Sequence, residues 1–257
     1  MPILFISHGP PFLAVADQPA GKFWDGLGNT LPKPRAILCI SAHWESVRPM
    51  ITSADHPETV HDFSGPPSLF SLEYAVRGDP ELADRIAGIL GNRGFDAVCD
   101  ARRGLDHGVW VPLMRIFPAG DIPVLQLSVQ SEENPLHHYE VGKALMPLRE
   151  EGLMIIGSGG ATHNLGEIGE YGIHDAPADY ALAFDDWLFN AVTTGNTEEL
   201  LDYKKTGPFA EENHPYPAEH LLPFFVPLGA AGEKSAGRCL FRGFLYGVLS
   251  MAAYVWE

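Results

Sequence analysis

The residues best suited to chemistry in this sequence are its eleven histidines. Imidazole readily ligates transition metals and titrates near neutral pH. His8 directly follows an apolar run (SHG at 7–9), and His43 follows a second one in the same manner (SAHW at 41–44). The carboxyl ends of strands border the ligand crevice of an open α/β sheet, so two histidines at such ends can converge. The pair predicts a metal site, whereas either histidine alone could simply hydrogen-bond its own loop.

Three further histidines lie in segments that suit the same crevice. His163 stands in GSGGATHNL at 157–165, after another apolar run, and the small residues there let backbone approach a ligand closely. His214 and His220 stand in NHPYPAEHLLP at 213–223, where prolines restrict the loop and a helix is expected to begin near residue 218. Glu219, beside His220, adds a carboxylate that could also be a ligand.

His107 is the sixth candidate, in GLDHGVW at 104–110. The alternative for this segment is that Asp106 caps a helix while His107 faces solvent. The loop His61-Asp62-Phe63, which precedes GPP at 65–67, could border a substrate, in a layer just outside the residues that contact it. Compact zinc motifs such as HExxH and CxxC are absent, so a metal site must be assembled from distant loops. The remaining histidines stand in polar loop contexts and are expected to have no site role: His56, His137, His138 and His174.

The elements that must position these side chains alternate between strands and helices. Short, almost continuous apolar runs predict buried strands at 3–7, 36–42, 122–129 and 153–158. Helical periodicity predicts helices at 80–90, 138–150, 179–192 and 219–228. The apolar stretch 239–255 is expected to return to the sheet as one or two edge strands. We therefore predict one α/β domain over residues 1–257, with a central, mostly parallel sheet flanked by helices and a metal site at the C-terminal strand ends.

Composition narrows the class of protein. The 257 residues are 46% hydrophobic and 19% charged, which is typical of a globular protein, and no apolar run approaches the roughly 20 residues of a membrane span. The first seven residues lack the features of a secretory signal, which favours a cytoplasmic location. A net charge of −16 disfavours nucleic acid and anionic membranes as partners. The sequence does not determine the oligomeric state, and a homo-oligomer is one alternative. The segment GSGG at 157–160 lacks the lysine of a phosphate loop.

Seven ordered motifs extend over nearly the whole chain: SHGPP at 7–11, SAHW at 41–44, HDFSGPP at 61–67, GLDHGVWVPL at 104–113, IPVLQLSV at 122–129, GSGGATHNL at 157–165 and AEHLLPFFVPLGAAG at 218–232. In this order they resemble the class III extradiol aromatic ring-opening dioxygenases, in the branch related to DOPA 4,5-dioxygenase. Each motif says little alone, but the ordered set is specific.

The resemblance implies a divalent metal, Fe(II) or Zn(II), held by His8, His43 and His220. It further implies that His163 lies close by as an acid/base or an additional ligand, and that His107 faces the substrate hydroxyl or oxygen. One departure concerns the spacing, because five residues separate His214 from His220, one more than this branch leads us to expect. Glu219 therefore stays open as the third ligand in place of His220.

The function expected from the resemblance is extradiol cleavage of a small catechol-type aromatic by O2. Neutral imidazoles leave metal positions open for two reactants, and His163, with a pKa expected near neutrality, could move the substrate protons. Trp44, Phe63 and Trp110 could pack on the ring or belong to the core. The alternatives are a zinc-containing, hydrolase-like metalloenzyme on the same scaffold, and a non-enzymatic protein with a closed metal site.

Overall fold

The apolar runs predicted as strands form the centre of one sheet in the computed structural model, which describes residues 1–257. Eight of the ten strands belong to this sheet, in the order β4-β3-β5-β2-β6-β1-β10-β7, and β8 and β9 form a separate hairpin. The strands are β1 (Ile3–Ser7), β2 (Ala36–Glu45), β3 (Met50–Thr52), β4 (Val98–Asp100), β5 (Val124–Val129), β6 (Leu153–Gly159), β7 (Arg238–Phe241), β8 (Phe244–Leu245), β9 (Leu249–Ser250) and β10 (Ala253–Trp256).

The centre of the sheet is parallel. β2 pairs in parallel with both β5 and β6, and β6 pairs in parallel with β1. The carboxyl ends of β1, β2 and β6 therefore lie at one edge, which places the segments that follow them side by side. Antiparallel pairs add β10 and β7 beyond β1, and β3 beside β5. The prediction of a single α/β domain with a mostly parallel sheet is confirmed.

Helices connect the strands. The α-helices are α1 (Pro19–Leu27), α2 (Pro80–Gly91), α3 (His107–Ile116), α4 (Pro135–Leu145), α5 (Asp179–Thr194), α6 (Thr197–Leu201), α7 (Tyr203–Thr206), α8 (Ala210–Asn213) and α9 (Leu222–Ala230). The 3-10 helices are η1 (Pro11–Ala14), η2 (Pro67–Ser71), η3 (Met146–Arg149), η4 (Ile168–Glu170) and η5 (Glu219–Leu221). Helix α2 begins where its sequence indicates, because the Asp79 side chain accepts from Leu82 N and proline occupies the first turn.

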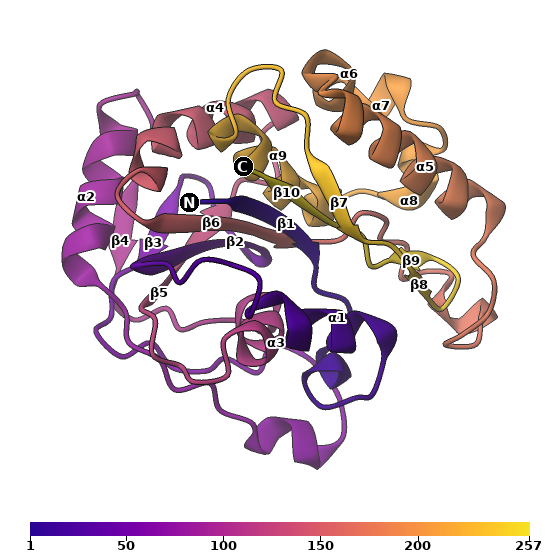
Figure 1. Cartoon of the computed structure of the whole chain (residues 1–257), viewed down its shortest axis with the longest axis horizontal. Helices are drawn as coiled ribbons and strands as arrows, with labels where there is room; N and C mark the ends of the chain where they lie inside the picture. The colour runs from indigo at the N-terminus through magenta and orange to yellow at the C-terminus, as the bar shows by residue number, and fades with distance from the viewer.

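Helices cover both faces of the sheet, as Figure 1 shows. One face packs on α1 and α3, through a core that includes Ile6, Ile37 and the fully buried Trp110. The opposite face packs on α2, α4 and α9, through residues such as Leu38 and Ile155. Consecutive residues of the central strands thus serve two different cores, which explains why these strands are apolar without alternation.

Some elements differ from the sequence expectation. Strands β3 and β4 have only three residues each, too few to show a period, and were not predicted. The helix expected at 138–150 begins earlier, at Pro135, and changes to the 3-10 helix η3 at Met146, next to Pro147. Of the C-terminal strands, β7 is the edge strand and β10 lies inside it, next to β1. None of the helices has the length and apolar character needed to cross a bilayer.

Candidate metal centre

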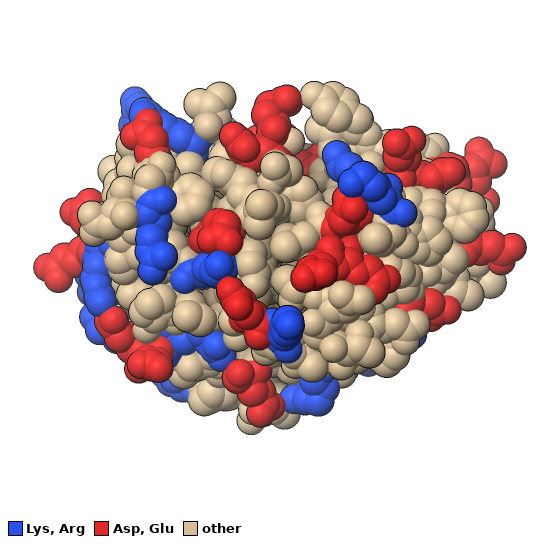
Figure 2. All heavy atoms as spheres, turned by 90° about the horizontal axis from the view of Figure 1, so that it is seen from above, with Lys and Arg blue, Asp and Glu red and all other residues tan.

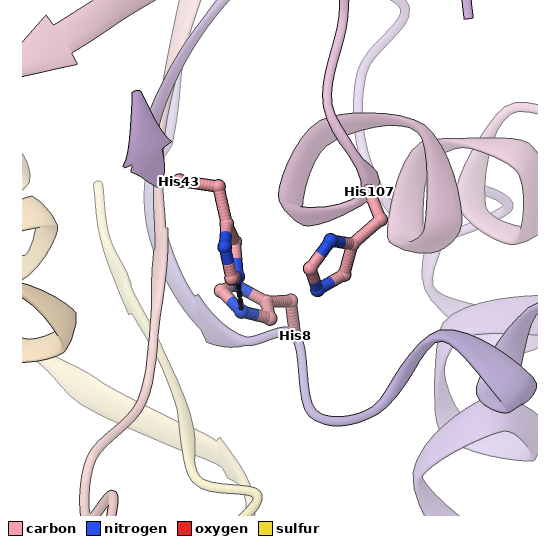
Figure 3. Close-up of side chains that lie close together, drawn as sticks. All are labelled: His8, His43 and His107. Carbon is pink, nitrogen blue, oxygen red and sulfur yellow. Dashed lines mark hydrogen bonds between the residues drawn. The ribbon is translucent and has the colours of Figure 1, made fainter. Parts of the chain in front are cut away.

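Three of the predicted histidines converge beyond the carboxyl ends of the strands. His8 directly follows β1, His43 lies near the end of β2, and His107 is the first residue of α3. Their rings point toward one another, as Figure 3 shows. The Nε2 atoms of His8 and His43 are 3.0 Å apart, and the ring centroids of His43 and His107 are 3.9 Å apart. The structure therefore brings together residues that are up to 99 positions apart in the chain.

A serine on β6 determines which nitrogen of His8 faces the cluster. The Ser158 hydroxyl donates to the Gly108 carbonyl, so its oxygen accepts from His8 Nδ1, 3.1 Å away. With its proton on Nδ1, His8 directs the Nε2 lone pair toward His43. Metal-binding histidines commonly have their second nitrogen held in this way.

Asp62, which the sequence indicated only as part of the HDF loop, bridges two of the histidines. Its Oδ1 accepts from the backbone N of His107 at 3.1 Å and from His107 Nδ1 at 2.9 Å, while its Oδ2 lies 3.6 Å from His43 Nδ1. Burial raises the pKa of Asp62, but the hydrogen bonds and charge interactions with His107 outweigh it, and the pKa falls to about 2. Asp62 is therefore an anion at neutral pH that orients both rings.

His220, in η5, belongs to the same cluster. Its ring centroid lies 5.4 Å from that of His8 and 4.9 Å from that of His43. Its Nδ1 donates to Glu219 Oε1 at 2.7 Å, so the Nε2 lone pair is unprotonated, and this atom is buried without a hydrogen-bond partner. His163 stacks on His220 with ring centroids 3.4 Å apart and an angle of 8° between the planes.

These donors fit a divalent metal. Two ligands in neighbouring positions on one ion, with metal–nitrogen bonds of about 2.1 Å, lie roughly 3 Å apart, as the Nε2 atoms of His8 and His43 do. A buried imidazole nitrogen without a partner is costly unless something binds it, and His220 Nε2 is such an atom. Ligand atoms also lie within 4.8 Å of one another in two groups, His8 with His43 and His107, and His163 with Glu219 and His220.

Burial keeps four of these imidazoles neutral. Desolvation, followed by the proximity of other histidines, lowers the pKa of His43 to about 4 and that of His163 to about 3. The same causes lower the pKa values of His8 and His220 well below the usual 6.5. Neutral imidazole is the form that ligates metals. A near-neutral pKa for His163 was expected from its role, and the burial of its ring among other histidines is the reason for the difference.

The cluster opens into a cavity of about 270 Å³. Five of the six candidate histidines line it: His8, His43, His107, His163 and His220. Asp62 and Phe63 line it as well, along with Leu165 and Ile168. A second hollow of about 190 Å³ shares His163, Leu165 and His220 with the first and continues along the loop 214–219. The histidines therefore lie where a small molecule could contact them.

Asp106 occupies the N-cap position of α3, but its side chain does not cap the helix. It accepts instead from Ser41 Oγ at 2.7 Å and from Arg103 at 2.9 Å, and it also accepts from the Gln126 amide. Ser41 in turn accepts from the backbone N of His43 at 3.2 Å. This network, in which Ser41, Asp106 and Gln126 are fully buried, holds the end of β2 in place. The alternative of a solvent-facing His107 is wrong, because only 6% of that residue is exposed.

Several other candidates lie outside the cluster. His214 is buried, and its Nε2 forms a hydrogen bond with the Ala161 carbonyl oxygen, 3.0 Å away. His61 bonds the Leu72 carbonyl and does not line the cavity, whereas its neighbours Asp62 and Phe63 do. Trp110 belongs to the core, where its indole N–H donates to the Val60 carbonyl. The HDF motif thus indicated a loop beside the cavity, but the residues of it that line the cavity are the second and third.

Comparison with known proteins gives one family over almost the whole chain. The family described as "Catalytic LigB subunit of aromatic ring-opening dioxygenase" matches residues 2–254. A Beta vulgaris protein named "4,5-DOPA dioxygenase extradiol" is 45% identical over 97% of this chain and 94% of its own length, and an Escherichia coli K12 protein of the same name is 35% identical over 98% and 93%. The crystal structure of an uncharacterized Escherichia coli K12 protein, 30% identical, superposes with a TM-score of 0.80 and full coverage of both chains.

Proposed function

Since this chain belongs to the LigB family of aromatic ring-opening dioxygenases, we propose that it opens substituted catechols on the extradiol side with Fe(II) as its metal. Family membership makes it an extradiol dioxygenase that uses a divalent metal. The choice of iron, the catechol substrate and the residue roles are the proposed parts. One observation carries the proposed metal site: His8 and His43 direct Nε2 atoms 3.0 Å apart at the cavity, and the ring of His220, whose Nε2 has no partner, lies 4.9 Å from that of His43.

The proposed ligands are His8, His43 and His220, in one catalytic domain that spans residues 1–257. Glu219 is assigned to orient His220, because its Oε1 accepts from Nδ1 of that ring. Three neutral imidazoles leave coordination positions open. The metal, when bound, would supply the redox chemistry that lets a catecholate react with O2. The residues around the cavity would bind the substrate, orient it and transfer its protons.

His163 is the proposed acid/base. Its ring lines the cavity and is neutral at physiological pH because burial lowers its pKa to about 3, so an unprotonated nitrogen is available to hydrogen-bond with a catechol hydroxyl. Stacking on His220 keeps its ring beside the ligand cluster. The same nitrogen can return the proton to an oxygen of the ring-opened product, which keeps both catechol oxygens and both atoms of O2.

We assign to His107 a hydrogen bond with a substrate oxygen in the cavity. Because Asp62 holds its Nδ1, its Nε2 is available to hydrogen-bond with a hydroxyl in the cavity. The carboxylate stabilises positive charge that develops on this imidazole when it takes up a proton. Phe63 lies on the same wall and can pack against the aromatic ring.

Reconstitution tests the activity and the metal together. Protein stripped of metal and loaded anaerobically with Fe(II) should consume one O2 per 4-methylcatechol or L-DOPA and form a yellow ring-opened product. The Zn(II)-loaded protein should bind its metal and give no oxygen uptake, because Zn(II) has no redox chemistry. Absence of oxygen uptake by the Fe(II) protein with every catechol tried would refute the proposal.

Single variants distinguish the proposed roles of His163 and His8, through their metal content and their kcat. His163→Gln should keep its metal and lose about 10²- to 10⁴-fold in kcat, the usual contribution of a general acid/base. His8→Gln should lose the metal itself, as measured by metal analysis after gel filtration. The exposed His56, replaced by Gln, is the matched control and should leave both quantities unchanged. Loss of metal in His163→Gln would identify His163 as a ligand.

A further inference from the structure

His163 differs from the other histidines of the cavity in how its ring is held. Ser158, Asp62 and Glu219 each hold a ring nitrogen of another histidine, whereas no group of the chain forms a hydrogen bond with the ring of His163. The His163 ring stacks on that of His220 instead, with centroids 3.4 Å apart. Its nitrogens are free for a substrate, and its place in the cavity therefore depends on the backbone that carries it.

The β8–β9 hairpin holds the residue before His163. Thr162 Oγ1 donates to the Val248 carbonyl oxygen at 2.8 Å and accepts from the backbone N of Ser250 at 2.7 Å. Both Thr162 and Ser250 are buried, so water does not compete for these bonds. The hydroxyl proton of Thr162 is already used, which makes this side chain an anchor rather than a donor to the substrate. The hairpin therefore fixes one side of the segment that carries His163.

Asp185 of α5 holds this hairpin at Ser250. Its Oδ1 accepts from Ser250 Oγ at 2.5 Å, and its Oδ2 accepts from Arg242 Nε at 2.7 Å. Burial raises the pKa of Asp185, and the hydrogen bonds from Ser250 and Arg242 oppose that rise. Because Ser250 lines the cavity and Asp185 does not, the carboxyl group links a helix outside the site to the cavity wall.

Asp185 is one of two buried acidic residues in the chain. Many of the 33 acidic residues lie on the surface, as on the face drawn in Figure 2, and only Asp106 and Asp185 are buried. Burial of a carboxylate is costly unless it is paired and hydrogen-bonded. Asp106 holds the end of β2, where His43 lies, and Asp185 holds the hairpin beside His163. Both buried groups thus anchor a segment next to a histidine of the cavity.

The other side of the His163 segment is also anchored to α5. The backbone N of His163 donates to the Asn213 carbonyl oxygen at 2.9 Å, and Asn213 Nδ2 donates to the Tyr180 carbonyl oxygen at 3.2 Å. Asn164 Nδ2 donates to Tyr180 Oη at 3.3 Å. Tyr180 and Asp185 both belong to α5, which packs against β9 at the right-hand end of the molecule in Figure 1. Helix α5 therefore supports the proposed acid/base, although none of the seven sequence motifs includes it.

We infer that Asp185 is a positioning residue for His163: through Ser250 and Thr162 it fixes the segment that carries this histidine, without contact with the metal or the substrate. The inference rests on the proposed function and assigns a part in catalysis to a residue outside the cavity. None of the three proposed metal ligands hydrogen-bonds to this network, so its loss should leave the metal in place. A displaced acid/base lowers the rate steeply, because proton transfer requires hydrogen-bond distance.

Asp185→Asn tests the link in the Fe(II)-loaded enzyme. The amide has one acceptor oxygen in place of two and carries no charge, so it cannot accept from both Ser250 and Arg242. We expect kcat per bound iron, from oxygen uptake with L-DOPA, to fall about 10- to 100-fold, while KM changes by less than about threefold. Iron content should remain that of the wild type. Dividing by bound iron separates this effect from a loss of folded protein.

Asp186→Asn is the matched control. Asp186 is the next residue of α5 and pairs with the same Arg242 at 2.5 Å, but its side chain is 55% exposed and does not reach Ser250. Its replacement should leave kcat per bound iron, KM and iron content unchanged. A loss equal to that of Asp185→Asn would contradict the inference.

Two substitutions at Thr162 test the same link from its other end. Thr162→Val keeps the shape of the side chain and removes the hydroxyl, so kcat per bound iron should fall as it does in Asp185→Asn. Thr162→Ser keeps the hydroxyl and should recover most of that loss. Both variants leave the buried pair of Asp185 and Arg242 intact, so they decide the question even where Asp185→Asn does not fold.

Wild-type kcat per bound iron in Asp185→Asn would overturn the inference. So would a loss of iron in parallel with activity, which a purely structural role predicts, and an equal loss of kcat in Thr162→Ser and Thr162→Val. Absence of oxygen uptake by the wild-type enzyme would instead remove the proposed function, and the role of Asp185 with it. The failures are distinguishable, because only the last one affects the wild type.

Discussion

At the scale of single residues, the candidate site depends on groups that orient the histidines as much as on the histidines themselves. Ser158 fixes the tautomer of His8, Glu219 that of His220, and Asp62 holds His43 and His107 together. Each of these partners directs one imidazole nitrogen toward the cavity. Residues in this position usually affect metal affinity or activity almost as much as the ligands do.

Asp62→Asn is the sharpest substitution at this scale. The amide keeps the shape of the side chain but removes the negative charge and one acceptor, so His43 and His107 lose their common anchor. We expect metal affinity or kcat to fall by about 10- to 100-fold while the fold is retained. Metal titration and oxygen uptake measure the two quantities separately.

Asp17→Asn is the matched control for this prediction. Asp17 is a surface carboxylate, 81% exposed, that pairs only with Lys22. Its replacement should change neither metal affinity nor kcat. An Asp62→Asn enzyme that matches wild type in both assays would show that Asp62 does not position the two rings.

At the scale of elements, two histidines depend on a close backbone contact beside β6. A Cβ added to Gly159 would lie 2.1 Å from the carbonyl oxygen of His220, and the Gly159 carbonyl accepts from the backbone N of His8 at 3.0 Å. Glycine therefore allows η5 to approach the end of β6 closely enough for His220 to face His8. Gly157 makes a similar close contact, because a Cβ added there would lie 2.2 Å from the Pro223 carbonyl oxygen.

Gly159→Ala should therefore push η5 away from the strand. We expect a loss of about 1 to 3 kcal/mol in the free energy of unfolding, as for overpacking of a tight interior, together with weaker metal binding. Gly88→Ala in α2 is the control, because a Cβ there meets nothing within 4 Å, and it should be neutral or stabilise by up to about 1 kcal/mol. Urea denaturation and metal titration of the two variants test this, and equal behaviour would contradict it.

At the scale of the whole molecule, the buried histidines couple folding to pH. Desolvation lowers the pKa of His138 and His214 to about 4, as it does for His43, although neither lies in the cluster. In the unfolded chain these imidazoles titrate near 6.5, so between pH 6.5 and about 4 the unfolded state binds more protons than the folded state. Stability is then greatest above pH 6.5 and decreases as the pH falls toward 4.

We expect the metal-free protein to lose stability steeply between pH 7 and pH 5. Each strongly shifted imidazole contributes about 1 to 2 kcal/mol over this range, so several together rival the whole stability of a typical domain. Urea denaturation of chelator-treated protein at several pH values measures the slope. His138 is remote from the site, and His138→Gln should reduce the number of protons taken up on unfolding, which sets that slope, by up to one. A free energy of unfolding that is flat from pH 7 to pH 5 would contradict the prediction.

Much of the fold could be predicted from the sequence because its signals are local. Runs such as 36–42 and 153–158 are apolar on both faces, which is the property of a strand covered by helices on each side. Histidines placed directly after such runs could meet, since the carboxyl ends of parallel strands lie at one edge of the sheet. The choice of His8 and His43 as the leading pair depended on nothing more than this.

Only the tertiary structure decided which side chains orient the histidines. Asp62 and His107 are 45 positions apart, and Ser158 and His8 are 150 apart, so no spacing rule links them. The same holds for Glu219, which the sequence left as a possible ligand and which the structure places on the far nitrogen of His220. Hydrogen bonds between side chains depend on ångström-scale geometry that arises when loops pack together. Strand patterns determine the edge of the sheet, and packing determines which atoms face one another there.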